Sequence, residues 1–194
     1  MKGMASTAEP LFVPALASLD DLVPHEGILS PEELEEVARG IAARPEFWRP
    51  LAPVDRERRR YELLYEDDRM DAWVLSWMPG QATGFHDHYI SSVGLCMAQG
   101  SVREDQMRYG MPHLEHHLRP GDSRRGDPGY IHRVRYADGE PAVTIHVYSP
   151  RLEWVGQYRL GEDGVVRREP SPGRNELRPQ LISEGALHGA LERF

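Results

Sequence analysis

From residue 61 onward the chain consists of short apolar or alternating runs, separated by clusters of Gly, Pro and Asp at intervals of roughly ten residues. Alternation of apolar and polar residues is typical of strands that bury one face. The candidate strands span residues 61–65, 72–77, 83–88, 93–98, 101–106, 113–118, 129–136, 142–148, 155–160 and 165–168. Because no helical pattern separates these runs, the sequence predicts an antiparallel β-sandwich or barrel.

The region before the strands differs in character. Its first part contains prolines and glycines without a sustained period, which predicts an irregular arm. Ser30 is followed by Pro31 and Glu33, the pattern of a capped helix start. Apolar residues then recur at helical spacing: Leu34, Val37 and Ile41. The expected organisation is an irregular arm (1–29), a helical segment packing on the barrel (30–59), the barrel (60–169) and a C-terminal extension (170–194) with a short helix over 181–191.

Composition narrows the function classes. The chain has 194 residues, of which 40% are hydrophobic, and this is enough for one well-buried core. The formal net charge of -8, from 31 Asp and Glu against 23 Lys and Arg, argues against binding to nucleic acid. No apolar run is long enough to cross a membrane, and Pro14 interrupts the apolar stretch at residues 11–19, so no secretory signal is expected. Cys96 is the single cysteine, so no intrachain disulfide can form, as is typical of a cytoplasmic protein.

The strongest chemical signal is the sequence His86-Asp87-His88. In a strand, alternate side chains project to the same face, so His86 and His88 can reach one ion while Asp87 points away. A third ligand is available in His132, which follows the turn at residues 128–129 and can be brought across the barrel by a neighbouring strand. An isolated pair of histidines can equally be an exposed strand feature. Imidazole binds iron, zinc, copper and nickel, so residue type alone does not fix the metal.

The residues around these histidines resemble a known family. The run WMPGQATGFHDH at residues 77–88, with Gln99-Gly100 and Glu104 behind it, is similar to the first metal motif of the cysteine dioxygenase type I family in the cupin superfamily. The runs GYIHRV at residues 129–134 and PAVTIHVYSP at residues 141–150 resemble the second motif and the strand after it. The resemblance covers residues 60–158, half of the chain. It implies an all-β, cupin-type double-stranded β-helix, which is an antiparallel β-barrel or jelly roll, with a few helices at the N-terminus.

The resemblance also implies a set of site residues. The ligands of an Fe(II) ion are then His86, His88 and His132. Tyr148 is then the active-site tyrosine, oriented by a relay of His146 and Thr144, where the family more often has serine. The residues themselves agree, because positions 144, 146 and 148 share one strand face and their polar groups can form a hydrogen-bonded line. The alternative for His146 is a buried core histidine, and the resemblance further implies a cis peptide bond before Pro150.

The chain departs from the family next to this site. The cysteine that is cross-linked to the tyrosine in the mammalian form of the family corresponds to Val93 here, so no thioether can form at that position. Cys96 lies in the same expected strand with opposite parity, and we interpret it as a small buried thiol. The candidates for the arginine that binds the substrate carboxylate are Arg58, Arg59 and Arg60. Counting back from His86 without gaps favours Arg60, but a slip of one residue reverses the face of a strand and would select Arg59.

These features and the resemblance predict an oxidoreductase, a mononuclear non-haem iron dioxygenase that oxidises the thiol of cysteine or a close small thiol with O2 to the sulfinic acid. Three neutral imidazoles leave the charge of a divalent metal uncompensated, which favours a thiolate donor. The alternatives are a metal-dependent cupin with another chemistry, such as a carbon-substrate oxygenase or isomerase, and a non-catalytic ligand-binding cupin. The expected partners are the thiol and O2, without nucleic acid or membrane, in a monomer or homodimer. The remaining histidines are expected at the surface (25 and 188) or on a solvated sheet edge (113, 116 and 117).

Overall fold

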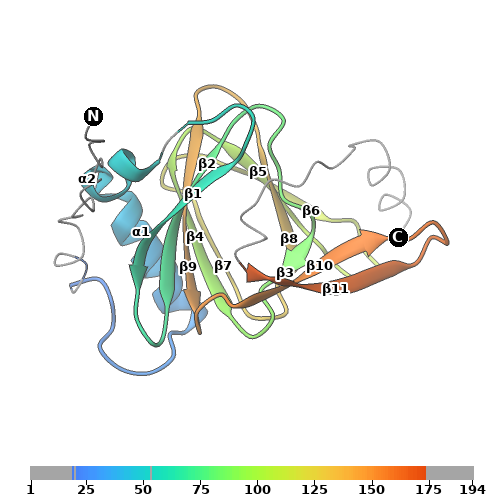
Figure 1. Cartoon of the computed structure of the whole chain (residues 1–194), viewed down its shortest axis with the longest axis horizontal. Coiled ribbons are helices and arrows are strands. Elements are labelled where there is room, and N and C mark those ends of the chain that lie inside the picture. Colours follow the sequence, from blue (N-terminus) through green and yellow to red (C-terminus); the bar gives the residue numbers. More distant parts are fainter. Residues whose placement is uncertain (1–18, 20, 53, 174–194) are drawn as a thin grey trace, which may run out of the picture.

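The computed structural model describes residues 19, 21–52 and 54–173, and most of these residues belong to two antiparallel sheets (Figure 1). The first sheet has the strand order β1-β2-β9-β4-β7, and the second has the order β11-β10-β3-β8-β5-β6. The strands of the first sheet are β1 (Arg60–Glu66), β2 (Asp71–Trp77), β9 (Ala142–Ser149), β4 (Ser92–Gln99) and β7 (Ser123–Gly126). Those of the second sheet are β11 (Val166–Pro172), β10 (Trp154–Leu160), β3 (His86–Asp87), β8 (His132–Tyr136), β5 (Val102–Gln106) and β6 (Leu114–Leu118).

The two sheets enclose a common apolar core. It joins Trp73 and Leu75 of β2 to Val134 of β8 and Val155 of β10. Because side chains alternate along a strand, each strand of the first sheet presents every second residue to this interior. The expected antiparallel barrel, the double-stranded β-helix of cupins, is confirmed.

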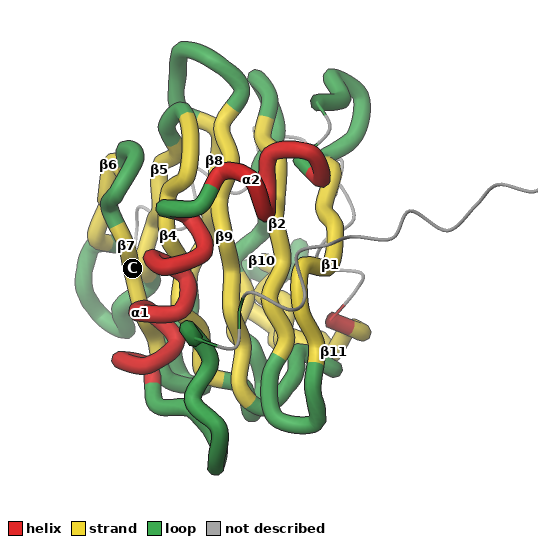
Figure 2. Tube along the Cα trace, turned by 90° about the vertical axis from the view of Figure 1, so that its left-hand side faces the viewer, coloured by secondary structure: helices red, strands yellow, loops and turns green. Residues whose placement is uncertain are grey.

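Helix α1 (Pro31–Ala42) covers the outer face of the first sheet (Figure 2). It begins as predicted, because the Ser30 hydroxyl accepts from the N–H of Glu33 at 3.3 Å and the Glu33 carboxylate accepts from the N–H of Ser30 at 2.7 Å. Its buried residues are Leu34, Val37, Ala38 and Ile41. The helix lies so close to β4 that a Cβ atom on Gly94 would be 2.3 Å from the carbonyl of Leu34. Only glycine therefore permits this contact.

The strand prediction differs from the structure at three strands, β3, β7 and β11. β3 is much shorter than the expected 83–88, because residues 83–85 form no ladder with a neighbouring strand, although the Thr83 N–H donates to the Val134 carbonyl at 2.8 Å. β7 was not predicted, because its sequence, SRRG, has no apolar alternation; it is held by backbone pairing to β4. β11 also runs beyond the expected 165–168, to Pro172.

The segment between α1 and β1 contains two further short helices, α2 (Pro45–Trp48) and η2 (Arg49–Leu51), which lie within the helical segment expected over 30–59. Residues 21–29 contain no helix or strand. The rest of the arm (1–18 and 20) and the expected helix over 181–191 lie outside the described residues. Within the described part of the chain, no helix is long and apolar enough to cross a membrane.

Candidate active site

Three histidines converge between β3 and β8. His86 on β3 lies directly opposite His132 on β8, and His88 follows the end of β3. The possible ligand atoms of the three rings lie within 4.8 Å of one another, and Nε2 of His88 is 3.3 Å from Nε2 of His132. All three side chains are buried. The register of the two strands thus brings together the three residues that the sequence analysis predicts as ligands.

Two of the rings are oriented by oxygen atoms behind them. Nδ1 of His86 lies 2.9 Å from the carbonyl oxygen of Gly84, and Nδ1 of His132 lies 2.7 Å from Oε1 of Glu104. Since a carbonyl and a carboxylate accept hydrogen bonds, each Nδ1 donates and each Nε2 presents its lone pair to the cluster. Such neutral nitrogen donors fit a divalent transition metal.

Glu104 is the carboxylate that supports His132. It lies on β5 with no exposed surface, accepts from the Tyr130 hydroxyl at 3.0 Å and is 3.4 Å from the guanidinium of Arg124. Burial alone would raise the pKa of Glu104, but the hydrogen bonds from His132 and Tyr130 hold that pKa below its usual value. In the sequence this residue is only part of a motif. Glu104 could have been singled out because it is an acidic residue on the same strand face as the buried Val102. An unpaired carboxylate would be unfavourable there, so a partner is expected.

His88 is held differently from the other two rings. Its Nδ1 atom is buried and makes no hydrogen bond to any described residue. Burial, and after it the nearby rings of His132 and His86, hold the pKa of His88 well below its usual value. The ring packs against those of His86, His132 and Tyr148, with centroids 5.1 Å apart in each pair.

Polar side chains on the inner face of β9 form a line that ends at Tyr148. Nε1 of Trp77 donates to Oγ1 of Thr144 at 2.8 Å, Oγ1 of Thr144 lies 3.0 Å from Nε2 of His146, and Nδ1 of His146 lies 3.1 Å from the Tyr148 hydroxyl. Within the described residues His146 is the acceptor available to the Thr144 proton, so His146 carries its own proton on Nδ1 and donates it to Tyr148. Burial, followed by His132 and Arg59, holds the pKa of His146 well below its usual value, in agreement with a neutral ring. The line expected from strand parity is present.

Arg59 and Arg60 point to opposite sides of the first sheet. Arg59 is buried, with 3% of its surface exposed, and its guanidinium lies 4.8 Å from the centre of the Trp77 ring. Arg60 is exposed and lies 3.7 Å from the carboxylate of Glu62. Arg59 is therefore the arginine on the side of Trp77 and His146.

A β-bulge in β1 affects which arginine faces the interior when parity is counted along the strand. Leu63 lies opposite Trp73 and Tyr65 lies opposite Ala72, so Leu64 has no partner on β2. One extra residue inverts the parity of the strand on one side of the bulge. If the bulge is left out of the count, Arg59 and Arg60 exchange faces.

Val93, which stands where the family has its cross-linking cysteine, and Cys96 lie on opposite faces of β4. Val93 lies opposite Tyr148 on the inner face, so the position of the family's cross-linking cysteine does adjoin the tyrosine. Cys96 lies opposite Ile145 on the outer face beneath α1, and burial raises the pKa of its thiol to about 11. The interpretation of Cys96 as a buried thiol is confirmed. The peptide bond before Pro150 is cis, as expected.

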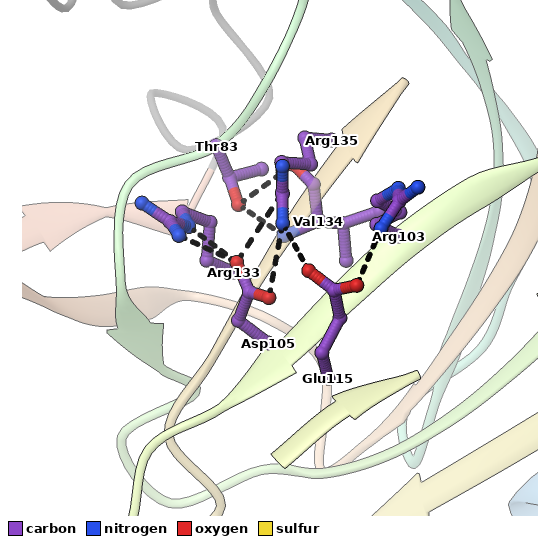
Figure 3. Close-up of polar contacts among 7 residues, drawn as sticks. All are labelled: Thr83, Arg103, Asp105, Glu115, Arg133, Val134 and Arg135. Carbon is purple, nitrogen blue, oxygen red and sulfur yellow. Dashed lines mark hydrogen bonds and ion pairs between the residues drawn. The ribbon is translucent and has the colours of Figure 1, made fainter. Parts of the chain in front are cut away.

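Ion pairs on the outer face of the second sheet tie β8 to its neighbours (Figure 3). Nε of Arg133 lies 2.9 Å from Asp105 of β5, and Arg135 lies 2.5 Å from Glu115 of β6. Glu115 also pairs with Arg103. These charged residues hold the strand that carries His132 from the side facing away from the cluster.

The remaining histidines stay apart from this site. His113 packs its ring against Phe85 at 4.9 Å, next to the edge strand β6. His116 and His117 lie on β6 and, like His113, are half-buried rather than fully solvated. His25 is exposed, and position 188 lies outside the described residues.

Comparisons with known proteins show the family of the chain. The sequence model of the cysteine dioxygenase type I family matches residues 1–160. Cysteine dioxygenase type 1 of Danio rerio is 28% identical over 149 residues, which cover 70% of this chain and 74% of that protein. The Homo sapiens protein is 26% identical over 132 residues, which cover 63% of this chain and 66% of that protein.

Some solved structures are also similar to this chain. A protein from Thermus thermophilus has a TM-score of 0.48 and 26% identity, covering 53% of this chain and 93% of that chain. An RmlC-like cupin protein from Desulfovibrio desulfuricans has a TM-score of 0.43 and 17% identity, covering 51% of this chain and 89% of that chain. Because the family match spans most of the sequence, the chain belongs to the cysteine dioxygenase type I family.

Proposed function

We propose that the protein is an iron-dependent thiol dioxygenase, which adds both atoms of O2 to the sulfur of cysteine or a close small thiol and yields the sulfinic acid. The observation that carries this proposal is the convergence of three buried histidines next to Tyr148. Among the described residues this cluster holds histidines without a carboxylate. Neutral ligands leave the charge of Fe(II) uncompensated and favour an anionic substrate donor, which a thiolate supplies.

The metal would be held by His86, His88 and His132. When bound, the iron would stabilise the thiolate form of the substrate and activate O2. The chain itself needs no strong base for the thiol, and its task is to hold the three rings and to orient the substrate.

Tyr148 and Arg59 would orient the substrate from the inner face of the first sheet. His146 donates to the Tyr148 oxygen and would thereby orient the tyrosine hydroxyl beside the substrate. The guanidinium of Arg59, stacked on Trp77, would pair with the substrate carboxylate through parallel hydrogen bonds. Thr144 would act at a distance, by fixing the tautomer of His146.

We further propose a cytoplasmic location, where reducing conditions keep the substrate as a thiol. All the residues in these roles come from one chain, so the proposed site would be complete in a monomer as well as in a homodimer.

The test is oxygen uptake by the Fe(II)-loaded protein with cysteine, homocysteine, 3-mercaptopropionate and cysteamine, with the sulfinate measured by mass spectrometry. Absence of uptake with all four thiols would contradict the proposal. Arg59→Gln and Arg60→Gln are a matched pair for the orienting arginine. Because cysteamine lacks a carboxylate, we expect Arg59→Gln to raise the KM for cysteine roughly ten- to hundredfold relative to that for cysteamine, and Arg60→Gln to change neither.

A further inference from the structure

The three ligand histidines differ in what fixes their orientation. His86 and His132 lie within strands and each has an acceptor for Nδ1. His88 lies beyond the end of β3, and no described residue hydrogen bonds to its Nδ1 atom. The direction of its ring therefore depends on the backbone on either side of it, at Asp87 and Tyr89.

Both of these flanking residues contact the same side chain, Arg168 of β11. Its Nε lies 2.6 Å from Oδ2 of Asp87 and its Nη2 lies 2.8 Å from Oδ1, which is a bidentate ion pair. Its guanidinium also lies 4.7 Å from the centre of the Tyr89 ring. Arg168 thus contacts the residue before His88 and the residue after it.

The backbone after His88 is in a conformation that needs such support. Tyr89 has a φ of 62°, in the left-handed region that residues with a bulky side chain seldom adopt. Its N–H donates to Oδ1 of Asp87 at 2.9 Å, the oxygen that also receives Nη2 of Arg168. Strained backbone of this kind persists where the surroundings hold it, and it concentrates at functional sites.

β10 and β11 form a hairpin (Figure 1), and β10 pairs with β3, which brings Arg168 close to the segment that carries His88. Arg168 crosses β10 at Gly156, where a Cβ atom would lie 2.2 Å from its Nε. From β10, Tyr158 donates its hydroxyl to Asp87 at 2.8 Å and Gly156 donates its N–H at 3.2 Å. Asp87 faces away from the three histidines. It is therefore the residue through which this hairpin contacts the segment that carries His86 and His88.

We infer that Arg168 is a positioning residue for the metal site, which holds Asp87 and Tyr89 and thereby sets the direction of the His88 ring. The inference rests on the proposed function in so far as His88 is a metal ligand. β11 begins at Val166, after the residues 1–160 that match the family, so the support comes from a part of the chain that this match does not cover.

The test compares Arg168→Gln with Arg167→Gln. Arg167 is the neighbour on β11, is half-exposed and pairs with Asp163 of its own hairpin at 2.6 Å, so it is a matched loss of one charge. The probe is Co(II) titrated into the metal-free protein, with the visible absorption spectrum reporting both affinity and ligand geometry. We expect Arg168→Gln to weaken Co(II) binding about tenfold or more, as is usual when groups that support metal ligands are lost, and to alter the spectrum. Arg167→Gln should leave both unchanged.

Arg168→Lys separates positioning from folding, because it keeps the charge beside Asp87 but lacks the planar fork. We expect a stable protein with an affinity between those of Arg168→Gln and the wild type. Wild-type affinity and an unchanged spectrum in Arg168→Gln or Arg168→Lys would overturn the inference.

If the wild type itself binds no metal, the proposed function fails, and hydrogen exchange in the metal-free protein decides the positioning role separately. The Tyr89 amide, which donates to Asp87, should then exchange faster in Arg168→Gln than in Arg167→Gln. Equal exchange rates would overturn the inference.

Discussion

Replacement of Asp71 by asparagine should stabilise the protein above pH 6. Asp71 begins β2 opposite Tyr148 and is buried, with 4% of its surface exposed. Its carboxyl oxygens receive long hydrogen bonds from the N–H of Leu152, at 3.3 and 3.4 Å. Burial raises the pKa of Asp71 from 3.8 to about 6.

The magnitude follows from proton linkage. Between pH 3.8 and about 6 the folded protein binds a proton that the unfolded chain has released, so stability falls as pH rises through this window. At about 1.4 kcal/mol per pH unit, the free energy of unfolding has lost about 3 kcal/mol once the pH is above 6. Asparagine has a similar shape, keeps the acceptor for Leu152 and carries no charge. Asp71→Asn should therefore be more stable than the wild type by up to about 3 kcal/mol at pH 7.5, and by about a third of that at pH 4.5.

Urea unfolding of both proteins at the two pH values measures this effect, and comparing them at the same pH removes the contributions of the other titrating groups. Asp67→Asn, in the hairpin of β1 and β2, is a control for which we expect the opposite change in the free energy of unfolding. Burial alone would raise the pKa of Asp67, but hydrogen bonds from the N–H groups of Arg69 at 2.8 Å and Met70 at 2.9 Å hold it below its usual value. Its stabilising contribution is therefore present at both pH values, and Asp67→Asn should destabilise at both. An Asp71→Asn protein that is less stable than the wild type at pH 7.5, or equally altered at both pH values, would refute the reasoning.

Three further predictions concern the site. Glu104→Gln removes the charge behind His132 and should weaken Co(II) binding about 10- to 100-fold in a titration; an unchanged affinity would show that the carboxylate does not support the ligand. Tyr148→Phe should bind iron at the wild-type ratio and lose turnover, as measured by metal analysis and oxygen uptake on one sample, and full activity would rule out the assigned role. Thr144→Ala removes the donor to Nε2 of His146 and should lower kcat, while Thr144→Ser, which keeps the hydroxyl, should restore it; equal rates in the two variants would contradict the relay.

The parts of the fold that the sequence predicts correctly have local signals. The capping box of Ser30 and Glu33 lies within one helical turn, and the alternating runs are each contained in one strand. The convergence of His86, His88 and His132 could be predicted because a short motif and a turn mark their positions along the chain. By contrast, β7 has no apolar residue, and only its pairing with β4 makes it a strand.

The site residues that the sequence could not assign depend on contacts between distant segments. Arg59 rather than Arg60 faces the interior because β1 bulges at Leu64, and the bulge is defined only by pairing with β2. Arg168 is separated from Asp87 by 81 positions, so its contact with the ligand segment leaves no trace in spacing. Parity within a strand is predictable, but parity across a bulge and pairing across the barrel are not.

The most direct test of the proposed function is the fate of isotopically labelled oxygen. The Fe(II)-loaded protein would be incubated with cysteine under 18O2 and the product analysed by mass spectrometry. The proposal predicts cysteine sulfinic acid in which both sulfur-bound oxygen atoms carry the label. Oxygen consumption without sulfinate, or sulfinate whose oxygen comes from water, would contradict it.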